Sequence, residues 1–130
     1  MRCAVNVNEM INEAEMLIEQ SYAPYSRFRV AAVLEDSEGM LHGGVNVENS
    51  SYGMTMCAER SAVFAAVSSG SRVFRKIVIY SPDGPPVPCG ACRQVLWEFC
   101  DEDFRITVVS DGVPPREFRL GELLPEAFQL

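Results

Sequence analysis

Apolar side chains recur every three or four residues in three stretches of the chain, a spacing typical of helices that bury one face. In the first stretch, Met10, Ala14 and Ile18 share such a face. The second stretch is followed by Gly70, a residue type that commonly ends a helix. The three predicted helices span Asn8–Gln20, Cys57–Ser69 and Gly90–Cys100.

Shorter apolar runs between and after these helices predict five β-strands. The first two are separated by Asp36-Ser37-Glu38-Gly39, which favours a tight turn, so we expect a hairpin. The third is a continuous apolar run, typical of a strand buried on both faces. The predicted strands span Val30–Leu34, Leu41–Val45, Lys76–Tyr80, Arg105–Val109 and a segment near Glu117–Leu120. This order predicts an α/β fold, a three-layer α-β-α sandwich around a mixed five-stranded sheet.

Composition narrows the classes of partner. The chain fits a single domain over residues 1–130, with 48% hydrophobic and 22% charged residues and a formal net charge of -7. Because nucleic-acid binders need a basic surface to neutralise phosphates, DNA and RNA partners are disfavoured. No apolar run approaches the roughly 20 residues of a membrane span, and no secretory signal is present. We therefore expect a cytoplasmic protein that acts on a small molecule and not at a membrane.

The cysteine pattern carries the most chemical information. Cys57 opens a Cys-Ala-Glu sequence, and Cys89 and Cys92 follow about thirty residues later as Pro-Cys-Gly-Ala-Cys. Three thiolates fill three corners of a zinc tetrahedron and leave the fourth for water, as catalytic zinc sites do. Glu59 lies close enough to such a metal to handle protons. This combination is the signature of zinc-dependent nucleobase deaminases, and it predicts a hydrolytic deaminase.

Both thiol clusters fall where a loop enters a predicted helix. Exposed backbone N–H groups and the helix dipole stabilise negative charge at such a position, which favours thiolates. Three thiolates around one divalent cation leave a net negative site. We hypothesise that the guanidinium of Arg60, near Cys57 in the sequence, withdraws part of this charge.

Six segments in the same order match one known family, and together their motifs are highly specific. They are Ala23-Pro24-Tyr25-Ser26-Arg27-Phe28, Asn46-Val47-Glu48-Asn49, Ser51-Tyr52-Gly53, Cys57-Ala58-Glu59-Arg60, Pro88-Cys89-Gly90-Ala91-Cys92-Arg93-Gln94-Val95 and the C-terminal Glu122-Leu123-Leu124-Pro125-Glu126-Ala127-Phe128. Over nearly its whole length the chain resembles the small, homotetrameric, zinc-dependent cytidine deaminases.

The resemblance implies a role for each matching position. It implies that Cys57, Cys89 and Cys92 bind one Zn²⁺ per chain and that Glu59 is the proton shuttle. Further residues are implied to contact a pyrimidine nucleoside. Asn46 and Glu48 would hold the ribose hydroxyls, Phe28 would lie against the ring, and the backbone of Ala58 would meet the carbonyl edge of the base. Tyr52 and Phe128 match positions through which neighbouring subunits of a homotetramer complete the shared site.

The reaction implied by this family is the hydrolytic deamination of cytidine and 2′-deoxycytidine to uridine and 2′-deoxyuridine, with release of ammonia, in pyrimidine salvage. In the implied mechanism a zinc-activated hydroxide attacks C4 of the base. Glu59 takes the proton from the water, delivers it to N3, and then protonates the departing amine.

Alternative functions stay open. The thiols alone are also compatible with a structural zinc site or a redox pair in a non-catalytic binding module. Within the enzymes, the substrate could be another aminopyrimidine, such as a nucleoside antibiotic. An editing deaminase that acts on nucleic acid is disfavoured by the acidic composition and by the cysteine, where those enzymes use histidine, before Ala58 and Glu59.

Several single residues have simpler interpretations. Asn46 and Glu48 are also typical of a polar loop at a strand end, Arg60 of a surface ion pair, and the aromatic residues of a core. His42, the only histidine, is expected at the surface or at a strand end. Cys3 and Cys100 lack a partner at ligand spacing, and we expect Cys100 at the end of a helix.

Overall fold

A five-stranded sheet in the order β2-β1-β3-β4-β5 forms the centre of the computed structural model, which describes residues 4–130. The strands are β1 (Ala31–Asp36), β2 (Leu41–Val45), β3 (Phe74–Ser81), β4 (Arg105–Ser110) and β5 (Val113–Arg119). β3 and β4 are parallel, whereas the other neighbouring strands are antiparallel. The predicted mixed sheet and the predicted hairpin of β1 and β2 are therefore confirmed.

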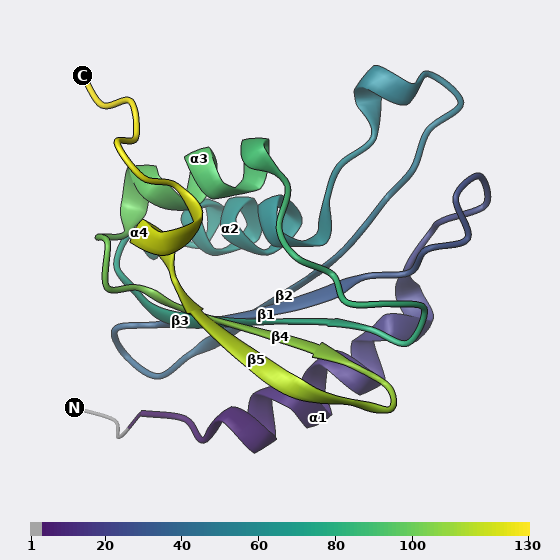
Figure 1. The fold of residues 1–130 in the computed structure, drawn as a ribbon, viewed down its shortest axis with the longest axis horizontal. Coiled ribbons are helices and arrows are strands. Elements are labelled where there is room, and N and C mark those ends of the chain that lie inside the picture. Colours follow the sequence, from purple (N-terminus) through teal and green to yellow (C-terminus); the bar gives the residue numbers. More distant parts are fainter. Residues whose placement is uncertain (1–3) are drawn as a thin grey trace.

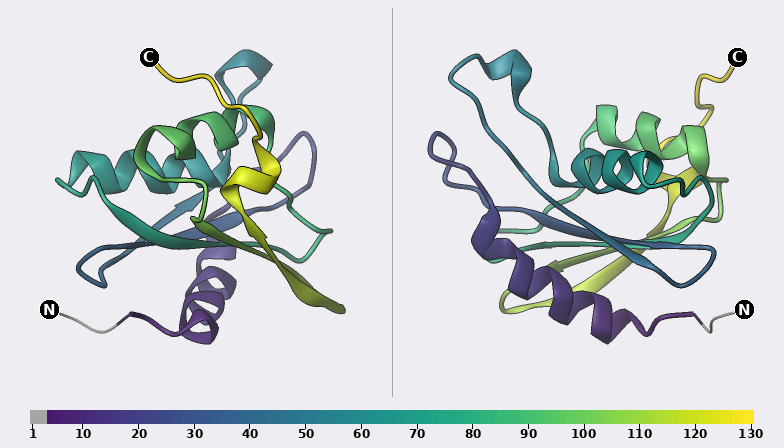
Figure 2. Two further views of the ribbon diagram at one scale, coloured as in Figure 1. Left: turned by 60° about the vertical axis from the view of Figure 1, so that its left-hand side comes forward. Right: turned by 180° about the vertical axis from the view of Figure 1, so that it is seen from behind.

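Helices cover both faces of this sheet (Figures 1 and 2). α1 (Val7–Leu17) lies against one face, and α2 (Ala58–Ser68) and α3 (Gly90–Phe99) lie against the other. The alternation of side chains along a strand separates two cores. In β1, Ala31 and Val33 pack with α1, whereas Ala32 and Leu34 pack on the face of α2 and α3. The predicted three-layer α-β-α sandwich is confirmed.

The C-terminal end of the sheet differs from the prediction. β5 begins at Val113, before the predicted segment near Glu117–Leu120, and Leu120 belongs to a short helix, α4 (Leu120–Leu123). The residues of β5 are mostly exposed and include Pro114 and Pro115. Prolines are tolerated in such an edge strand, and an exposed strand has little apolar alternation to reveal it. The short 3₁₀ helix η2 (Tyr52–Met54) was also not predicted, whereas η1 (Ile18–Gln20) forms the last turn of the first predicted helix.

His42 lies near the start of β2, which agrees with its expected place at the surface or at a strand end. Its side chain is only 14% exposed, and its Nε2 lies 2.9 Å from Oδ2 of Asp36. The hydroxyl of Ser71 donates to the same oxygen at 2.8 Å. The buried Asp36 carboxylate needs donors, and His42 and Ser71 supply them.

The remaining cysteine predictions are only partly covered by the structure. Cys100 follows the end of α3, as predicted, and burial raises the pKa of its thiol to about 12. Cys3 lies outside the described residues.

Among residues 4–130, no helix combines the length and apolar character needed to span a membrane.

Candidate active site

Three thiols from two helix starts meet at one end of the molecule. Cys57 is the N-cap residue of α2, Cys89 is the N-cap residue of α3, and Cys92 lies in the first turn of α3. The sulfur of Cys89 is 3.8 Å from that of Cys57 and 3.4 Å from that of Cys92, and all three lie within 4.8 Å of one another. Within the described part of the chain, this is the one group of three or more side chains that could hold a metal ion.

The electrostatics of this cluster favour a thiolate at Cys57. Hydrogen bonding with Cys92, and next with Arg60, lowers the pKa of Cys57 to about 5. The Nη2 of Arg60 donates to the Cys57 sulfur at 3.3 Å, and this contact raises the pKa of the guanidinium. Conversely, hydrogen bonding to Cys57 and burial raise the pKa of Cys92. A soft set of three sulfur donors at two helix N-termini fits Zn²⁺.

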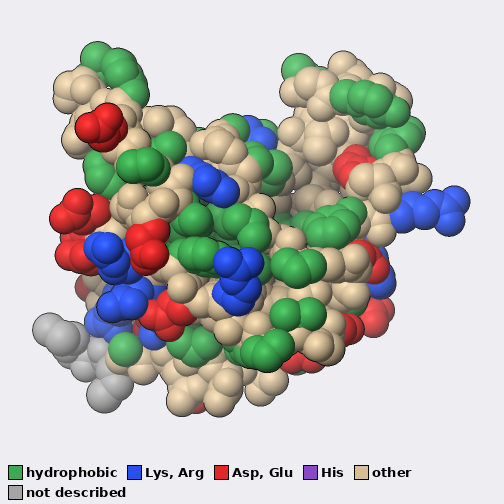
Figure 3. All heavy atoms as spheres, viewed as in Figure 1, with side chains coloured by type: hydrophobic (Ala, Val, Ile, Leu, Met, Phe, Trp, Pro, Cys, Tyr) green, Lys and Arg blue, Asp and Glu red, His purple; other side chains and the backbone are tan. Residues whose placement is uncertain are grey.

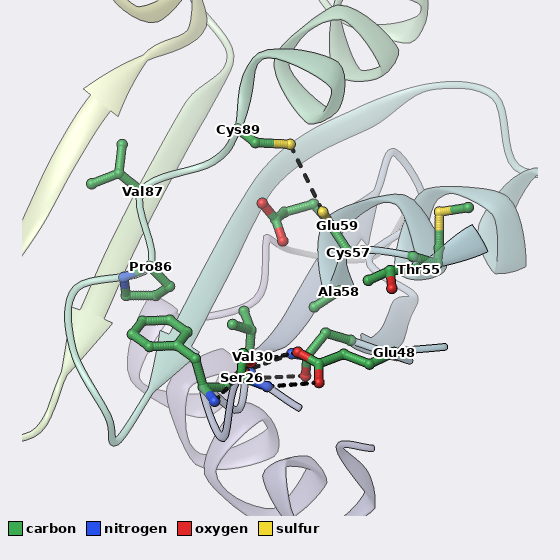
Figure 4. Close-up of a pocket in the computed structure, with 13 residues that line it drawn as sticks. Ser26, Val30, Glu48, Thr55, Cys57, Ala58, Glu59, Pro86, Val87 and Cys89 are labelled. Carbon is green, nitrogen blue, oxygen red and sulfur yellow. Dashed lines mark hydrogen bonds between the residues drawn. The ribbon is translucent and has the colours of Figure 1, made fainter. Parts of the chain in front are cut away.

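Glu59 is the buried carboxyl group next to these thiols. It lies in the first turn of α2 and is only 5% exposed, and Figure 4 shows its carboxylate pointing into a cavity beside Cys57 and Cys89. Burial, and after it the charge of Cys57, raises the pKa of Glu59 to about 7. A carboxyl group with this pKa can both accept and donate a proton at neutral pH.

The cavity has a volume of about 250 Å³ and brings together most of the residues named from the sequence. Seven of them line it: Phe28, Asn46, Glu48, Cys57, Ala58, Glu59 and Cys89. Two others lie next to these lining residues, because Cys92 and Arg60 both contact Cys57 or its partner thiol. The sequence did not identify the apolar walls formed by Val30, Met56, Pro86 and Val87.

Tyr52 and Phe128 do not line this cavity in the single chain. Tyr52 is 75% exposed and borders a neighbouring hollow, where its ring packs edge-on against Tyr25. Phe128 is 69% exposed, and its carbonyl accepts a hydrogen bond from Gln94. The segment with η2 and the C-terminal segment project from the same end of the molecule, and hydrophobic side chains lie at both projections (Figure 3).

The side chain of Asn46 makes three hydrogen bonds to neighbouring protein groups. Its Nδ2 donates to the carbonyl of Phe28 at 2.7 Å, and its Oδ1 accepts from the backbone N–H of Val30 at 3.0 Å and from the hydroxyl of Ser21. A side-chain amide has two N–H donors, so one remains for another acceptor. Asn46 thus holds the start of β1 in addition to facing the cavity.

Like Asn46, Glu48 both binds neighbouring protein groups and lines the cavity. Its Oε1 accepts from the backbone N–H groups of Tyr25 and Ser26, at 2.9 and 3.1 Å, and its Oε2 accepts from the Ser26 hydroxyl. The hydrogen bond from that hydroxyl is the main cause of the lowered pKa of Glu48. An ionised carboxylate offers about four acceptor sites, so one is left for a ligand.

Comparison with known proteins places this chain in a family. Residues 5–108 match the cytidine and deoxycytidylate deaminase zinc-binding region. The chain belongs to this deaminase family. It is 43% identical to the cytidine deaminase of Sporosarcina psychrophila, with 95% of this chain and 92% of that protein covered. It is 44% identical to the cytidine deaminase of Halalkalibacterium halodurans, with 92% and 91% covered.

The fold agrees with this assignment to the deaminase family. The crystal structure of cytidine deaminase from Burkholderia pseudomallei superposes with a TM-score of 0.90 at 39% identity and covers 95% of this chain and 100% of that one. The chain therefore has the fold of a solved cytidine deaminase over nearly its whole length. The chain is an enzyme of the cytidine deaminase type.

Proposed function

We propose that this enzyme hydrolyses cytidine and 2′-deoxycytidine to the corresponding uridines and ammonia, with Cys57, Cys89 and Cys92 as the ligands of one Zn²⁺ and Glu59 as the proton shuttle. The observation that carries the proposal is the position of Glu59. A nearly fully buried carboxyl group with a pKa of about 7 faces a cavity beside three thiols, which is how a general acid and base is placed in an active site.

The number of thiols supports a catalytic site over a closed structural one. Structural zinc sites hold four protein ligands, whereas the group in residues 4–130 contains three. Bound zinc supplies a Lewis acid that lowers the pKa of a water molecule to about 7. The resting charge of the ligand set is offset by the two helix N-termini and by Arg60, whose Nη2 is 3.3 Å from the Cys57 sulfur.

Glu59 moves two protons in the proposed mechanism. It first accepts a proton from the attacking water and delivers it to N3 of the pyrimidine, which makes C4 more electrophilic. After the oxygen has added to C4, Glu59 takes the remaining hydroxyl proton and passes it to the amino group, and ammonia leaves. The N3 proton stays on the product, so cytidine and water give uridine and ammonia.

Asn46 and Glu48 are proposed to recognise the sugar. Asn46 has one N–H left after its bond to Phe28, and Glu48 has one acceptor site left after its bonds to the loop. A sugar hydroxyl both accepts and donates, so it can satisfy both groups. A free base would leave them unpaired, which costs binding.

The base is proposed to lie against Phe28, with the backbone of Ala58 at its carbonyl edge. Tyr52 and Phe128 are proposed to complete the site of a neighbouring subunit in a homotetramer. Their exposure of 75% and 69% supports this, because large hydrophobic side chains at projecting segments mark association surfaces. A role in pyrimidine salvage and a cytoplasmic location are part of the same proposal.

A comparison of three substrates tests this function. Purified zinc-loaded protein is mixed with cytidine, 2′-deoxycytidine or free cytosine, and ammonia release is measured together with the change in ultraviolet absorbance. We expect turnover of both nucleosides and at least about a hundredfold lower kcat/KM for cytosine, because the sugar-binding groups then lack a partner. Equal turnover of cytosine would contradict the roles of Asn46 and Glu48. No turnover of any of the three would contradict the proposed reaction.

A further inference from the structure

The loop between β3 and α3, residues 82–88, is tied to the start of β1 by an ion pair. The carboxylate of Asp83 accepts from Nε and Nη2 of Arg29, at 3.1 and 3.0 Å, and from the backbone N–H of Arg29, at 2.9 Å. Three hydrogen bonds thus join two segments that are 54 residues apart in the sequence. The backbone N–H of Asp83 is itself held by the hydroxyl of Ser81 at 3.0 Å.

The next residue of this loop lies directly against Phe28. Gly84 has a φ of 156°, which side chains rarely allow, and a Cβ at this position would lie 3.1 Å from Cε2 and 3.6 Å from Cζ of the Phe28 ring. The backbone of the loop therefore forms the backing of that ring. Any residue with a Cβ at this position would crowd the Phe28 ring, whereas glycine leaves the ring where it is.

The same loop also lines the cavity. Pro86 is buried, and Pro86 and Val87 line the cavity together with Phe28 before the chain reaches the thiol of Cys89. Figure 4 shows Pro86 and Val87 along the strand-to-helix connection that leads to Cys89. The ion pair thus joins Arg29, the residue after Phe28, to the loop that carries Pro86 and Val87.

We propose that Asp83 is a positioning residue for the pyrimidine ring: by binding Arg29 it sets the separation between Phe28 and the Pro86–Val87 wall, with Gly84 backing the Phe28 ring. This inference rests on the proposed function, in which Phe28 contacts the base. The ion pair is substantially exposed, with side-chain exposures of 50% for Arg29 and 25% for Asp83. Exposed pairs contribute little to global stability, so a change here acts on substrate binding more than on unfolding.

The test uses Asp83→Ala and Asp83→Asn, with Glu117→Ala as a matched control that removes another exposed ion pair, the one to Arg105 at 2.8 Å. For Asp83→Ala we expect KM for cytidine to rise about tenfold with kcat within about twofold, because ordering the two walls is then left to the substrate. Asp83→Asn retains an oxygen for the Arg29 N–H and recovers part of the KM. Thermal midpoints of all three variants stay within about 3 °C of the parent protein.

Two results would overturn the inference. One is a KM for Asp83→Ala that equals the KM of the Glu117→Ala control. The other is a rise in KM that accompanies a large fall in thermal midpoint and that Asp83→Asn does not relieve, which is the behaviour of a purely structural residue.

Hydrogen exchange without substrate separates this inference from the proposed function. The backbone amides of residues 28–30, and those of positions 83, 84 and 87, which are the only non-proline residues in 82–88, should exchange faster in Asp83→Ala than in the parent protein, and should not change in Glu117→Ala. Unchanged exchange in Asp83→Ala contradicts the inference whatever the substrate. If the parent protein fails to turn over cytidine, the proposed function is wrong, and the exchange experiment alone then decides whether Asp83 positions the loop.

Discussion

Gly44 is the position where one added methyl group should disturb the active site most directly. This glycine lies in β2, opposite Ala32 of β1, and faces the first turns of α2. A Cβ on Gly44 would lie 2.4 Å from the backbone nitrogen of Ala62 and 2.7 Å from the carbonyl oxygen of Ala58. Because these are backbone atoms, no rotation of a side chain relieves the overlap.

The size of the effect follows from these distances. Ordinary contact begins at 3.4 Å, so Gly44→Ala requires β2 and α2 to separate by about 1 Å. Overpacking of this kind costs about 1–3 kcal/mol, partly offset by up to about 1 kcal/mol from the lower chain entropy of alanine in the unfolded state. The thermal midpoint should therefore fall by roughly 5–10 °C. A displacement of about 1 Å in the turn that carries Glu59 should lower kcat about a hundredfold.

Gly43→Ala is the matched control for this prediction. The neighbouring glycine faces the other side of the sheet, and its Cβ would lie 2.7 Å from Cδ2 of Leu17, the end of a flexible side chain. We expect a thermal midpoint within about 3 °C of the parent protein and kcat within about twofold. Thermal unfolding and ammonia release from cytidine are measured for both variants. If Gly44→Ala behaved like Gly43→Ala in both assays, the reasoning about the contact of β2 with α2 would be refuted.

Two further predictions concern charge. Arg60→Gln removes the guanidinium beside the Cys57 sulfur and should weaken zinc binding about tenfold in competition with a chromophoric chelator, whereas an unchanged affinity contradicts the charge-balancing role. For Asp36, burial favours the protonated form, but the hydrogen bonds from His42, Met40, Ser71 and Glu38 prevail and lower its pKa from 3.8 to about 2. Its contribution to stability is therefore complete above pH 4 and is lost as the pH falls toward 2. Between pH 5 and pH 3 the free energy of unfolding, from urea titrations, should fall by about 1 kcal/mol more in the parent protein than in Asp36→Asn, and equal losses would contradict this assignment.

Much of the fold was predictable because the core elements carry strong periodic signals. α1 and α2 bury residues at helical spacing, and the continuous apolar run of β3 is buried as expected. β5 was placed too late in the chain because it is an exposed edge strand, in which packing imposes no alternation. The contact of His42 with the buried carboxylate of Asp36 was not predicted, because nothing in the local sequence reveals it.

The motif residues of the candidate site could be predicted from the sequence, but the contacts that hold the walls of the cavity in place could not. The cysteine motifs and Glu59 have spacings that chemistry constrains, and the structure brings them together around one cavity. The bond from Asp83 to Arg29 joins segments 54 residues apart, and no local pattern marks such a pair. The contact of Gly84 with Phe28 likewise depends on the path of the loop, which the sequence leaves open.

The role of Glu59 as the proton shuttle is decided by the turnover of Glu59→Gln, with the zinc content determined on the same sample. Glu13→Gln, at an exposed position of α1, serves as the control for the change of residue type. We expect Glu59→Gln to keep its zinc and its thermal midpoint but to lose at least about a thousandfold in kcat for cytidine, while Glu13→Gln retains full activity. Ammonia release by zinc-loaded Glu59→Gln at more than about a tenth of the parent rate would contradict the assignment of Glu59 as the proton shuttle.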